Sequence, residues 1–209
     1  MVNADEELKK IKEEVINLKA SSLCLERIKN KVLPVIGEGN HKAEIVFVGE
    51  APGENEAKSG RPFCGRSGKL LDEFLASINI PRESVYITNI VKDRPPKNRD
   101  PLPEEIEVYA PFLDRQIEII KPKIIATLGR FSMQYIMNRY GLSDKLKPIS
   151  EIHGQVFETT LPCLPDEALA KAGGNKVKVV PLYHPAVAIY NQHSKATLME
   201  DFKVLKTLI

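Results

Sequence analysis

The spacing of apolar residues along the chain predicts several amphipathic helices. Between residues 5 and 20, leucine, isoleucine and valine recur every three or four positions with lysine and glutamate between them, which places the apolar side chains on one helix face. The same spacing predicts helices over 67–78, 103–120 and about 131–139. We expect Ser67 to cap the first of these three, and Pro103 with the two acidic residues after it to begin the second.

Four other segments are short and almost wholly apolar, which is typical of strands buried on both faces. They are AEIVFVG (43–49), SVYITNIV (84–91), KIIATLG (123–129) and VKVVPLY (177–183). Because strands and helices alternate, the pattern predicts an α/β fold, a three-layer α/β/α sandwich with a central, mostly four-stranded parallel sheet. Ligands of such sheets bind beyond the carboxyl ends of the strands. The segments GEAPG, TN, LGR and YHP follow the predicted strands and are therefore the candidate site.

The length of 209 residues predicts one domain. Within it we expect an amino-terminal helical segment over 1–36 and a surface insertion over 161–178, with a short helix between Pro165 and Gly173. The chain is 43% hydrophobic and 28% charged, as in globular rather than disordered proteins. No apolar run reaches the ~20 residues of a membrane span, and the charged amino terminus is unlike a signal peptide. We therefore expect a cytoplasmic protein without a membrane partner.

Several common functional motifs are missing from the sequence. Cys24, Cys64 and Cys163 are scattered, so neither a disulfide framework nor a zinc site can be built from cysteine alone. The GRSGKL segment (65–70) approaches a phosphate-binding P-loop, but Phe63 and Leu70 stand where that motif requires glycine and Ser or Thr. Zinc-protease, calcium-loop and dinucleotide motifs are also missing. The sequence therefore supports neither ATPase, metal nor nicotinamide chemistry.

The charge distribution is more informative than the total charge. A net charge of +2 is too small to indicate a nucleic-acid binder. The KDRPPKNR segment (92–99), however, carries four basic residues and one acidic residue in a proline-rich stretch that cannot form a helix. Such a loop either contacts phosphates or is an ordinary solvated loop, and its own sequence leaves both interpretations open.

The motifs at the predicted strand ends form a series. In order they read GEAPGxxE, GxPFxGxxGxLLD, VYITNxVKxRPPxNRxPxPEE, TLGR, and HGQ followed by PxYHPA. This series runs from about residue 37 to the end of the chain and resembles family 4 of the uracil-DNA glycosylases, the thermostable type. Five motifs in one order are specific, whereas any one alone would be weak. The resemblance implies a monofunctional glycosylase of base excision repair, which flips uracil out of DNA and hydrolyses its N-glycosidic bond to leave an abasic site.

The resemblance places the uracil-reading asparagine at Asn89. Its amide oxygen would accept from N3–H of uracil and its NH2 would donate to O4, whereas cytosine presents the opposite pattern. By the same resemblance, Phe63 is the ring that stacks on the flipped base, and Gly49 lies beside the base. His184 is the residue that donates a hydrogen bond to uracil O2. Taken singly, each of these is more often a turn or packing residue. Together, at the ends of successive strands, they favour a binding site.

Two carboxylates complete the set that the resemblance implies. Glu50 holds the water-positioning place, and Glu56 holds the place that excludes the methyl group of thymine. The sequence leaves open which of the two handles the water. Glu54 is expected to be an ordinary solvated surface residue.

A further set of residues is expected to contact DNA without reading the base. The basic loop and the start of helix 67–78 offer phosphate contacts. The residues after His184 offer the wedge that fills the gap left by the flipped base, although Ala188 and Tyr190 replace a leucine and an arginine of the family pattern. The expected DNA-binding residues are Ser67, Gly68, Lys69, Arg94, Lys97, Arg99, Arg130, and Ile189 or Tyr190.

The family pattern also includes an iron-sulfur cluster held by four cysteines, and most of these are missing here. The third position is Asp93, the fourth aligns with Tyr109, and near the amino terminus only Cys24 is left. One thiolate cannot hold a cluster that normally takes four. We therefore expect no cofactor and no metal, with packing and polar contacts around Tyr109 holding the amino-terminal helix instead.

Two alternative functions stay open at the level of sequence. The first is a non-catalytic or slow relative that captures uracil-containing DNA; its covalent version is disfavoured because residues 92–104 hold neither an insertion nor a histidine. The second is a glycosylase of wider scope that acts on other deaminated bases. The expected partner is uracil-containing DNA, single- or double-stranded, bound by a monomer. The sequence identifies no sliding clamp or polymerase partner.

Overall fold

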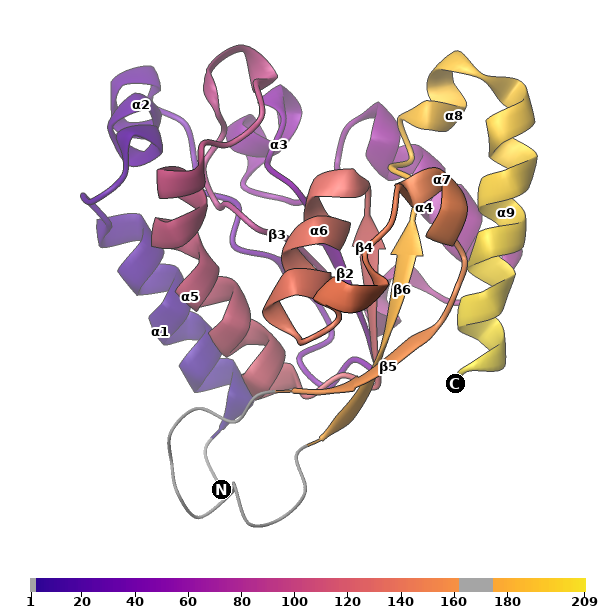
Figure 1. Ribbon diagram of the computed structural model, residues 1–209. Coiled ribbons are helices and arrows are strands. Elements are labelled where there is room, and N and C mark those ends of the chain that lie inside the picture. Colours follow the sequence, from indigo (N-terminus) through magenta and orange to yellow (C-terminus); the bar gives the residue numbers. More distant parts are fainter. Residues whose placement is uncertain (1–2, 162–174) are drawn as a thin grey trace.

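The computed structural model describes residues 3–161 and 175–209, without the side chains of Tyr190, Gln192 and His193. The short helix expected in the insertion lies outside these residues. A six-stranded sheet of order β1-β3-β2-β4-β6-β5 carries helices on both faces (Figure 1). The strands are β1 (Glu38–Gly39), β2 (Ile45–Gly49), β3 (Tyr86–Asn89), β4 (Ile124–Leu128), β5 (Phe157–Thr160) and β6 (Lys176–Leu182).

The four inner strands β3, β2, β4 and β6 are parallel, which confirms the predicted fold class. Every residue of β2, β3 and β4 is buried, as their apolar sequences predict. An antiparallel strand at each edge was not predicted: β1 pairs with β3, and β5 with β6. β1 has two residues, and β5 alternates half-buried and exposed positions. Neither edge strand therefore has the continuous apolar run that identifies the inner strands.

The helices form a layer on each side of the sheet. α1, α5 and α6 pack on one face and α4 and α9 on the other. Alternate residues of β2 show the division, since Val46 and Val48 join the first core and Ile45 and Phe47 join the second. The helices are α1 (Ala4–Asn17), α2 (Ser22–Asn30), α3 (Glu54–Ser59), α4 (Arg66–Ser77), α5 (Pro103–Ile120), α6 (Arg130–Arg139), α7 (Ile149–Ile152), α8 (Val187–Tyr190) and α9 (Gln192–Thr207).

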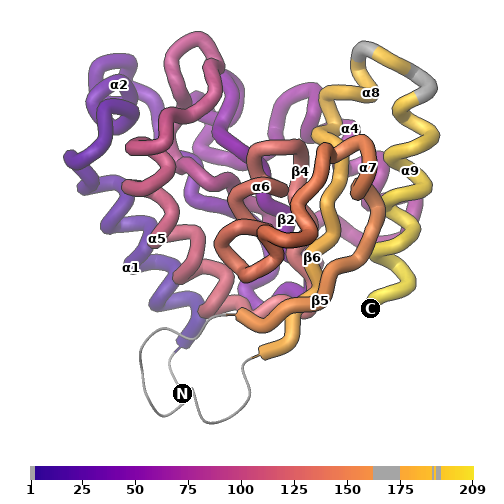
Figure 2. The backbone as a smooth tube through the Cα atoms, viewed as in Figure 1, coloured from indigo at the N-terminus to yellow at the C-terminus, as the bar shows by residue number. Residues whose placement is uncertain are grey.

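The amino-terminal helices pack directly on the rest of the domain. α1 lies along α5 (Figure 2) and buries Leu8, Ile11 and Val15 in the same core. At the surface between these helices, Arg115 donates two hydrogen bonds to the carboxylate of Glu14, at 2.5 and 2.8 Å. The segment predicted over 1–36 thus shares its core with the sheet.

The start of α4 differs from the prediction. α4 begins at Arg66, and Gly65 occupies the N-cap position without a side-chain cap, so the expectation that Ser67 caps this helix was wrong. The Gly65 N–H instead donates to the carboxylate of Glu56, at 3.0 Å. This capping carboxylate lies nine residues earlier and could not be recognised from the local spacing. No helix in the described part of the chain is long and apolar enough to cross a membrane.

Candidate active site

A cavity of about 370 Å³ opens at the carboxyl ends of the parallel strands. Its wall combines the segment after β2, the end of β3 with the loop that follows, and the segment after β6. This is the position at which parallel sheets bind ligands. Of the six residues that the resemblance assigns to base binding or catalysis, five line this one cavity: Glu50, Glu56, Phe63, Asn89 and His184.

Asn89 lines the cavity and carries an unpaired polar atom. It is the last residue of β3 and only 1% exposed. Its side-chain oxygen Oδ1 is buried and has no hydrogen-bond partner among the described residues. A buried acceptor without a partner costs about 1–3 kcal/mol of stability. The arrangement therefore suits a ligand that brings a hydrogen-bond donor to this oxygen.

Gly49 lies opposite Asn89 in the sheet register and makes room for the site. A Cβ atom at this position would lie 2.3 Å from Asn89 Oδ1 and 2.8 Å from the Phe63 ring. Any side chain would therefore displace one or both of these groups. Gly49 contributes to the candidate uracil site by letting the amide and the ring approach the end of β2.

The turn that carries Phe63 is held from two sides. Phe63 has a φ of 47°, in the left-handed region that is unfavourable for a residue with a side chain. Oε1 of Glu56 accepts hydrogen bonds from the N–H groups of Cys64 and Gly65, each at 3.0 Å. Behind the turn, a Cβ atom on Gly68 would lie 1.8 Å from the Phe63 carbonyl oxygen. Gly68 is thus buried, with its Cα packed against the Phe63 carbonyl, and its predicted backbone contact with DNA stays a prediction.

His184 lies two residues beyond β6, with its ring centroid 5.8 Å from that of Phe63. The N–H of Ala186 donates to Nδ1 of the imidazole over 3.2 Å. Because Nδ1 accepts, this hydrogen bond assigns the proton of the neutral ring to Nε2. Burial lowers the pKa of His184 to about 4, and the Glu56 carboxylate acts in the opposite direction. Near neutral pH the ring is therefore uncharged and has one N–H donor to offer.

Glu50 follows β2 directly and is half-buried in the cavity wall. Burial raises the pKa of its carboxyl group to about 7; the Asp100 carboxylate also raises it, and Arg130 opposes the shift. A carboxyl group with this pKa exchanges its proton near neutral pH, as a general base should. Asp100 lines the same cavity and was not predicted, because it occupies an unspecified position of the NRxPxPEE motif.

With this geometry established, known proteins give a direct comparison: residues 36–205 match the Uracil DNA glycosylase superfamily. The chain belongs to this superfamily. The Type-4 uracil-DNA glycosylase of Sulfurisphaera tokodaii is 46% identical over 202 residues, which cover 96% of this chain and 84% of that protein. The Type-4 uracil-DNA glycosylase of Archaeoglobus fulgidus is 47% identical over 180 residues, which cover 86% of this chain and 84% of that protein. The Type-4 uracil-DNA glycosylase of Thermotoga maritima is 40% identical over 182 residues, which cover 86% of this chain and 85% of that protein. The family resemblance inferred from the motifs is confirmed.

The basic loop between β3 and α5 lies beside α2 (Figure 2). Pro95, Asn98 and Arg99 of this loop line the cavity. Arg99 lines the cavity and donates to both carboxylate oxygens of the buried Glu105, at 2.8 and 2.6 Å. Arg94 lies 3.6 Å from Glu54, which is exposed as predicted. Lys97 is exposed, in a single 3-10 turn. Arg99 therefore anchors the loop, whereas Lys97 points its charge to the surface.

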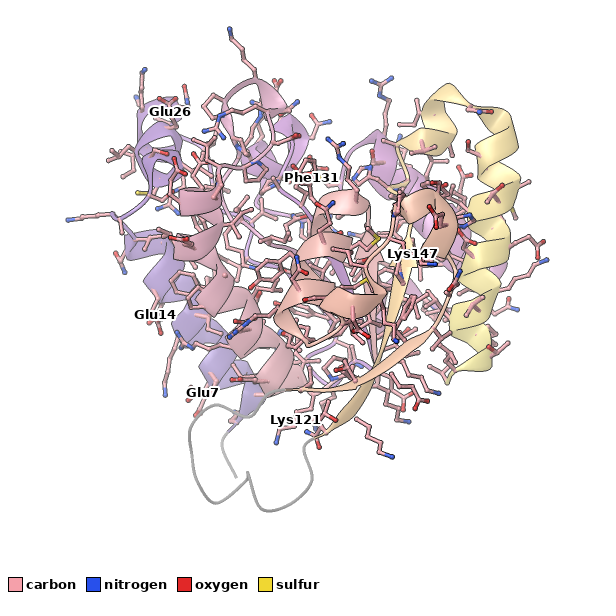
Figure 3. All side chains as sticks on the ribbon, in the orientation of Figure 1. Glu7, Glu14, Glu26, Lys121, Phe131 and Lys147 are labelled. Atoms are coloured by element: carbon pink, nitrogen blue, oxygen red, sulfur yellow. The ribbon has the colours of Figure 1, made fainter. Side chains whose placement is uncertain are left out.

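The start of α6 forms another part of the rim. The Arg130 guanidinium lies over the Phe131 ring, 4.4 Å from its centroid, and 3.7 Å from the Asp100 carboxylate. Phe131 lies at the same end of the molecule as Glu26 of α2 (Figure 3). Of the predicted residues on α4, Ser67 lines the cavity and Lys69 is exposed.

The short helix α8 follows the HPA motif at the cavity mouth. Ile189 is half-buried there, and the side chain of Tyr190, the other predicted wedge, lies outside the described residues. Val187 is 37% exposed and was not considered in the sequence analysis. Its apolar character and its position next to Ala186 of the cavity wall make it a further candidate wedge.

The positions aligned with cluster cysteines lie together in the structure. The Tyr109 hydroxyl donates to Asp93 Oδ2 at 2.6 Å, and Arg27 Nη1 lies 3.4 Å from Asp93 Oδ1. The Cys24 thiol donates to the Ser21 carbonyl oxygen at 2.9 Å. Within residues 3–161 and 175–209, no group of three or more His, Cys, Asp or Glu side chains could hold a metal ion. A single thiol among these residues does not fit a cluster that takes four thiolates.

Proposed function

We propose that this chain removes uracil from DNA as a monofunctional glycosylase, a hydrolase of base excision repair. The nucleotide leaves the helix, its base enters the cavity, and water cleaves the N-glycosidic bond to leave an abasic site. The observation that carries this proposal is that Asn89 lines the cavity and that its buried Oδ1 has no partner in the described chain. The names of the Type-4 relatives support the same function.

Asn89 selects uracil by its pattern of donors and acceptors. Its Oδ1 accepts from N3–H of uracil, and its NH2 donates to O4. Cytosine offers an acceptor at N3 and a donor at N4, so both contacts would be repulsive. Phe63 stacks on the base and adds about 1–3 kcal/mol of affinity that does not depend on base identity.

His184 stabilises the leaving base. As the bond breaks, its electron pair goes to uracil N1, and negative charge spreads to O2. The Nε2–H donor of a neutral imidazole meets this charge without first losing or gaining a proton. The pKa of about 4 supports this role because the ring stays neutral throughout the physiological range.

Glu50 positions the attacking water and, as a carboxylate, stabilises the positive charge that develops on the sugar. Only its deprotonated form does both. Glu56 acts differently: through its hydrogen bonds to Cys64 and Gly65 it fixes the Phe63 turn, and with this turn the wall that excludes the thymine methyl group. The water therefore belongs to Glu50.

The rim residues grip the DNA backbone. Arg94, Lys97, Arg99, Lys69 and Arg130 meet phosphates, with Ser67 at the cavity and the apolar side chains of α8 in the gap left by the flipped base. A monomer binds single- or double-stranded DNA in this way. The protein acts inside the cell, in the compartment that contains the DNA. No cofactor takes part, so protein purified without oxygen should hold no stoichiometric iron or sulfide; finding both would overturn this part of the proposal.

The experiment that tests the function uses a single strand with one uracil, followed by alkaline cleavage at abasic sites. The wild-type chain should cleave this strand and leave the matched thymine strand intact. It should act more slowly on duplex, because unpairing and unstacking the base costs a few kcal/mol. Uracil-specific binding without any product at enzyme excess would contradict the proposal and favour a non-catalytic relative.

A further inference from the structure

The side chain of Lys92 is completely buried next to the backbone of Asn89. It is 0% exposed, and its Nζ lies 2.7 Å from the Asn89 carbonyl oxygen. Its two other hydrogen bonds go to Gln116 Oε1 at 2.7 Å and Thr88 Oγ1 at 2.8 Å. All three neighbouring atoms are uncharged oxygens. This lysine is outside the cavity wall and has no place in the mechanism described above.

The hydrogen bonds of the neighbours favour the charged form of Lys92. The Thr88 hydroxyl lies 2.8 Å from the Ile36 carbonyl oxygen and 3.3 Å from Gln116 Oε1, so the shorter contact is its better acceptor. The Gln116 NH2 group donates to the same Ile36 oxygen at 2.9 Å. Thr88 Oγ1 and Gln116 Oε1 therefore both present lone pairs to Lys92, as the Asn89 carbonyl does. Three acceptors require three N–H bonds, which only the charged ammonium has.

Keeping this charge inside the protein is costly. Burial lowers the pKa of Lys92 to about 7, and the Asp114 carboxylate acts in the opposite direction. Asp114 is itself hydrogen-bonded to Arg139 Nε at 2.8 Å, so a guanidinium already shares its charge. An apolar side chain of similar volume would avoid the desolvation cost of an ammonium. The position therefore favours a role for the charge itself.

We propose that Lys92 is a positioning residue for uracil excision, which fixes Asn89 through its backbone carbonyl and holds a positive charge behind the Asn89 end of the cavity, where O4 of the departing uracil would carry part of the negative charge. This inference rests on the proposed function and on the proposed contact of Asn89 with the base. When the N-glycosidic bond breaks, its electron pair passes to uracil, and the charge spreads onto the oxygens. A fixed charge in a poorly solvated site acts on this anion more strongly than it would in water.

A purely structural lysine would give different kinetics. If Lys92 only satisfied three buried acceptors, its loss would distort Asn89 and slow every substrate by the same factor. If its charge stabilises the departing anion, the loss depends on the leaving group. 5-Fluorouracil is a suitable comparison, because its electron-withdrawing fluorine stabilises the anion. The rate on this base therefore depends less on stabilisation of the anion by the protein.

The experiment compares Lys92→Met and Lys92→Gln with the full-length wild-type chain on single strands containing uracil or 5-fluorouracil. Rates are measured in single turnover at saturating enzyme, so that binding and product release do not enter. Lys92→Gln keeps N–H donors and loses the charge. If Lys92→Met shows no cooperative melting transition, and is therefore not folded, the test is made with Lys92→Gln alone. Thr88→Val is the matched control, since it disturbs the same network and retains the ammonium.

Both Lys92 variants should lose about 10²-fold in rate on uracil, the scale seen when one group that stabilises a developing anion is removed. On 5-fluorouracil, the factor by which their rate falls should be several-fold smaller than on uracil. In Thr88→Val, the rate should fall by the same factor on both bases. Equal losses on the two bases in folded Lys92 variants, or no loss, would overturn the proposal. A wild-type chain that leaves both strands intact would instead refute the proposed function.

Discussion

Asn89 and Asp93 lie four residues apart, and their buried oxygens have different surroundings. At the cavity, Asn89 Oδ1 has no hydrogen-bond partner among the described residues. At the amino-terminal helices, Asp93 Oδ2 accepts from the Tyr109 hydroxyl at 2.6 Å, and Oδ1 has no hydrogen bond but lies 3.4 Å from the Arg27 guanidinium. We call Arg27, Asp93 and Tyr109 the Tyr109 cluster. The Asp93 carboxylate thus finds a donor and an opposite charge inside the fold, whereas no described residue supplies a donor to the Asn89 amide oxygen. This difference fits a ligand at the cavity and a structural role for the Tyr109 cluster.

The resemblance implies that the cavity keeps the family pattern and that the amino-terminal region departs from it, and the same difference gives a physical reason. Base recognition requires donors and acceptors that match uracil, so few residue types can replace Asn89. A metal cluster at the amino-terminal helices would only have to hold neighbouring segments together. One hydrogen bond and one ion pair among Arg27, Asp93 and Tyr109 do this without a thiolate. The two regions should therefore respond to substitution in different ways, one in rate and the other in stability.

Glu50→Gln should change the protein most, through its single-turnover rate. Loss of the water-positioning carboxylate should lower the single-turnover rate on uracil DNA by about 10²- to 10⁴-fold. The wild-type rate should rise with pH up to about 7 and level off above it, because burial raises the pKa of Glu50 to this value and only the carboxylate is active. Glu50→Gln should lose this pH dependence.

Glu54→Gln is the control for this prediction, because Glu54 is exposed and pairs with Lys58 at 2.6 Å. Its rate should stay within about twofold of wild type, since exposed pairs contribute little. A Glu50→Gln variant with wild-type rate and pH profile would remove Glu50 from the mechanism.

The next effect is on stability, in Tyr109→Phe. Removing the hydroxyl leaves the buried Asp93 carboxylate short of a donor, which should lower the free energy of unfolding by about 1–3 kcal/mol. Chemical denaturation measures this change. Tyr135→Phe is the control, because its hydrogen bond to Asp114 is longer, at 3.3 Å, and should matter less. In both variants the single-turnover rate should stay near wild type; a rate loss without a stability loss in Tyr109→Phe would erase the distinction between the two regions.

The smallest effect is on binding, in Lys97→Ala. This exposed side chain should contact one phosphate. Its removal should therefore lower the affinity for uracil-containing and control single strands by the same factor. The slope of log affinity against log salt should fall by about 0.7. Lys145→Ala, which removes another exposed lysine, should leave both affinity and slope unchanged. An unchanged slope in Lys97→Ala would make the basic loop an ordinary solvated surface.

The sequence predicted the inner sheet and the location of the site because both depend on local patterns. Continuous apolar runs such as Ile45–Gly49 identify the parallel strands, and the polar residues that follow them must meet at one edge of the sheet. The edge strand β5 lacks such a run because it is half exposed. Its pairing with β6 depends on a neighbour that local sequence does not reveal.

Contacts between distant residues could not be predicted for the same reason. Arg27 reaches Asp93 across 66 positions, Tyr109 reaches it across 16, and no local period links them. The hydrogen bonds from Cys64 and Gly65 to Glu56 likewise depend on how α3 meets the Phe63 turn. Resemblance supplied the identity of Glu56, but only the structure shows what its carboxylate holds.

Base reading by Asn89 is tested by the single-turnover rate of Asn89→Asp on a strand containing one cytosine. A protonated carboxyl group can donate to cytosine N3 while its other oxygen accepts from N4. The variant should therefore release cytosine, which the wild type leaves intact, and should excise uracil more slowly than the wild type. Wild-type uracil rates in both Asn89→Asp and Asn89→Ala, with cytosine untouched, would contradict the claim.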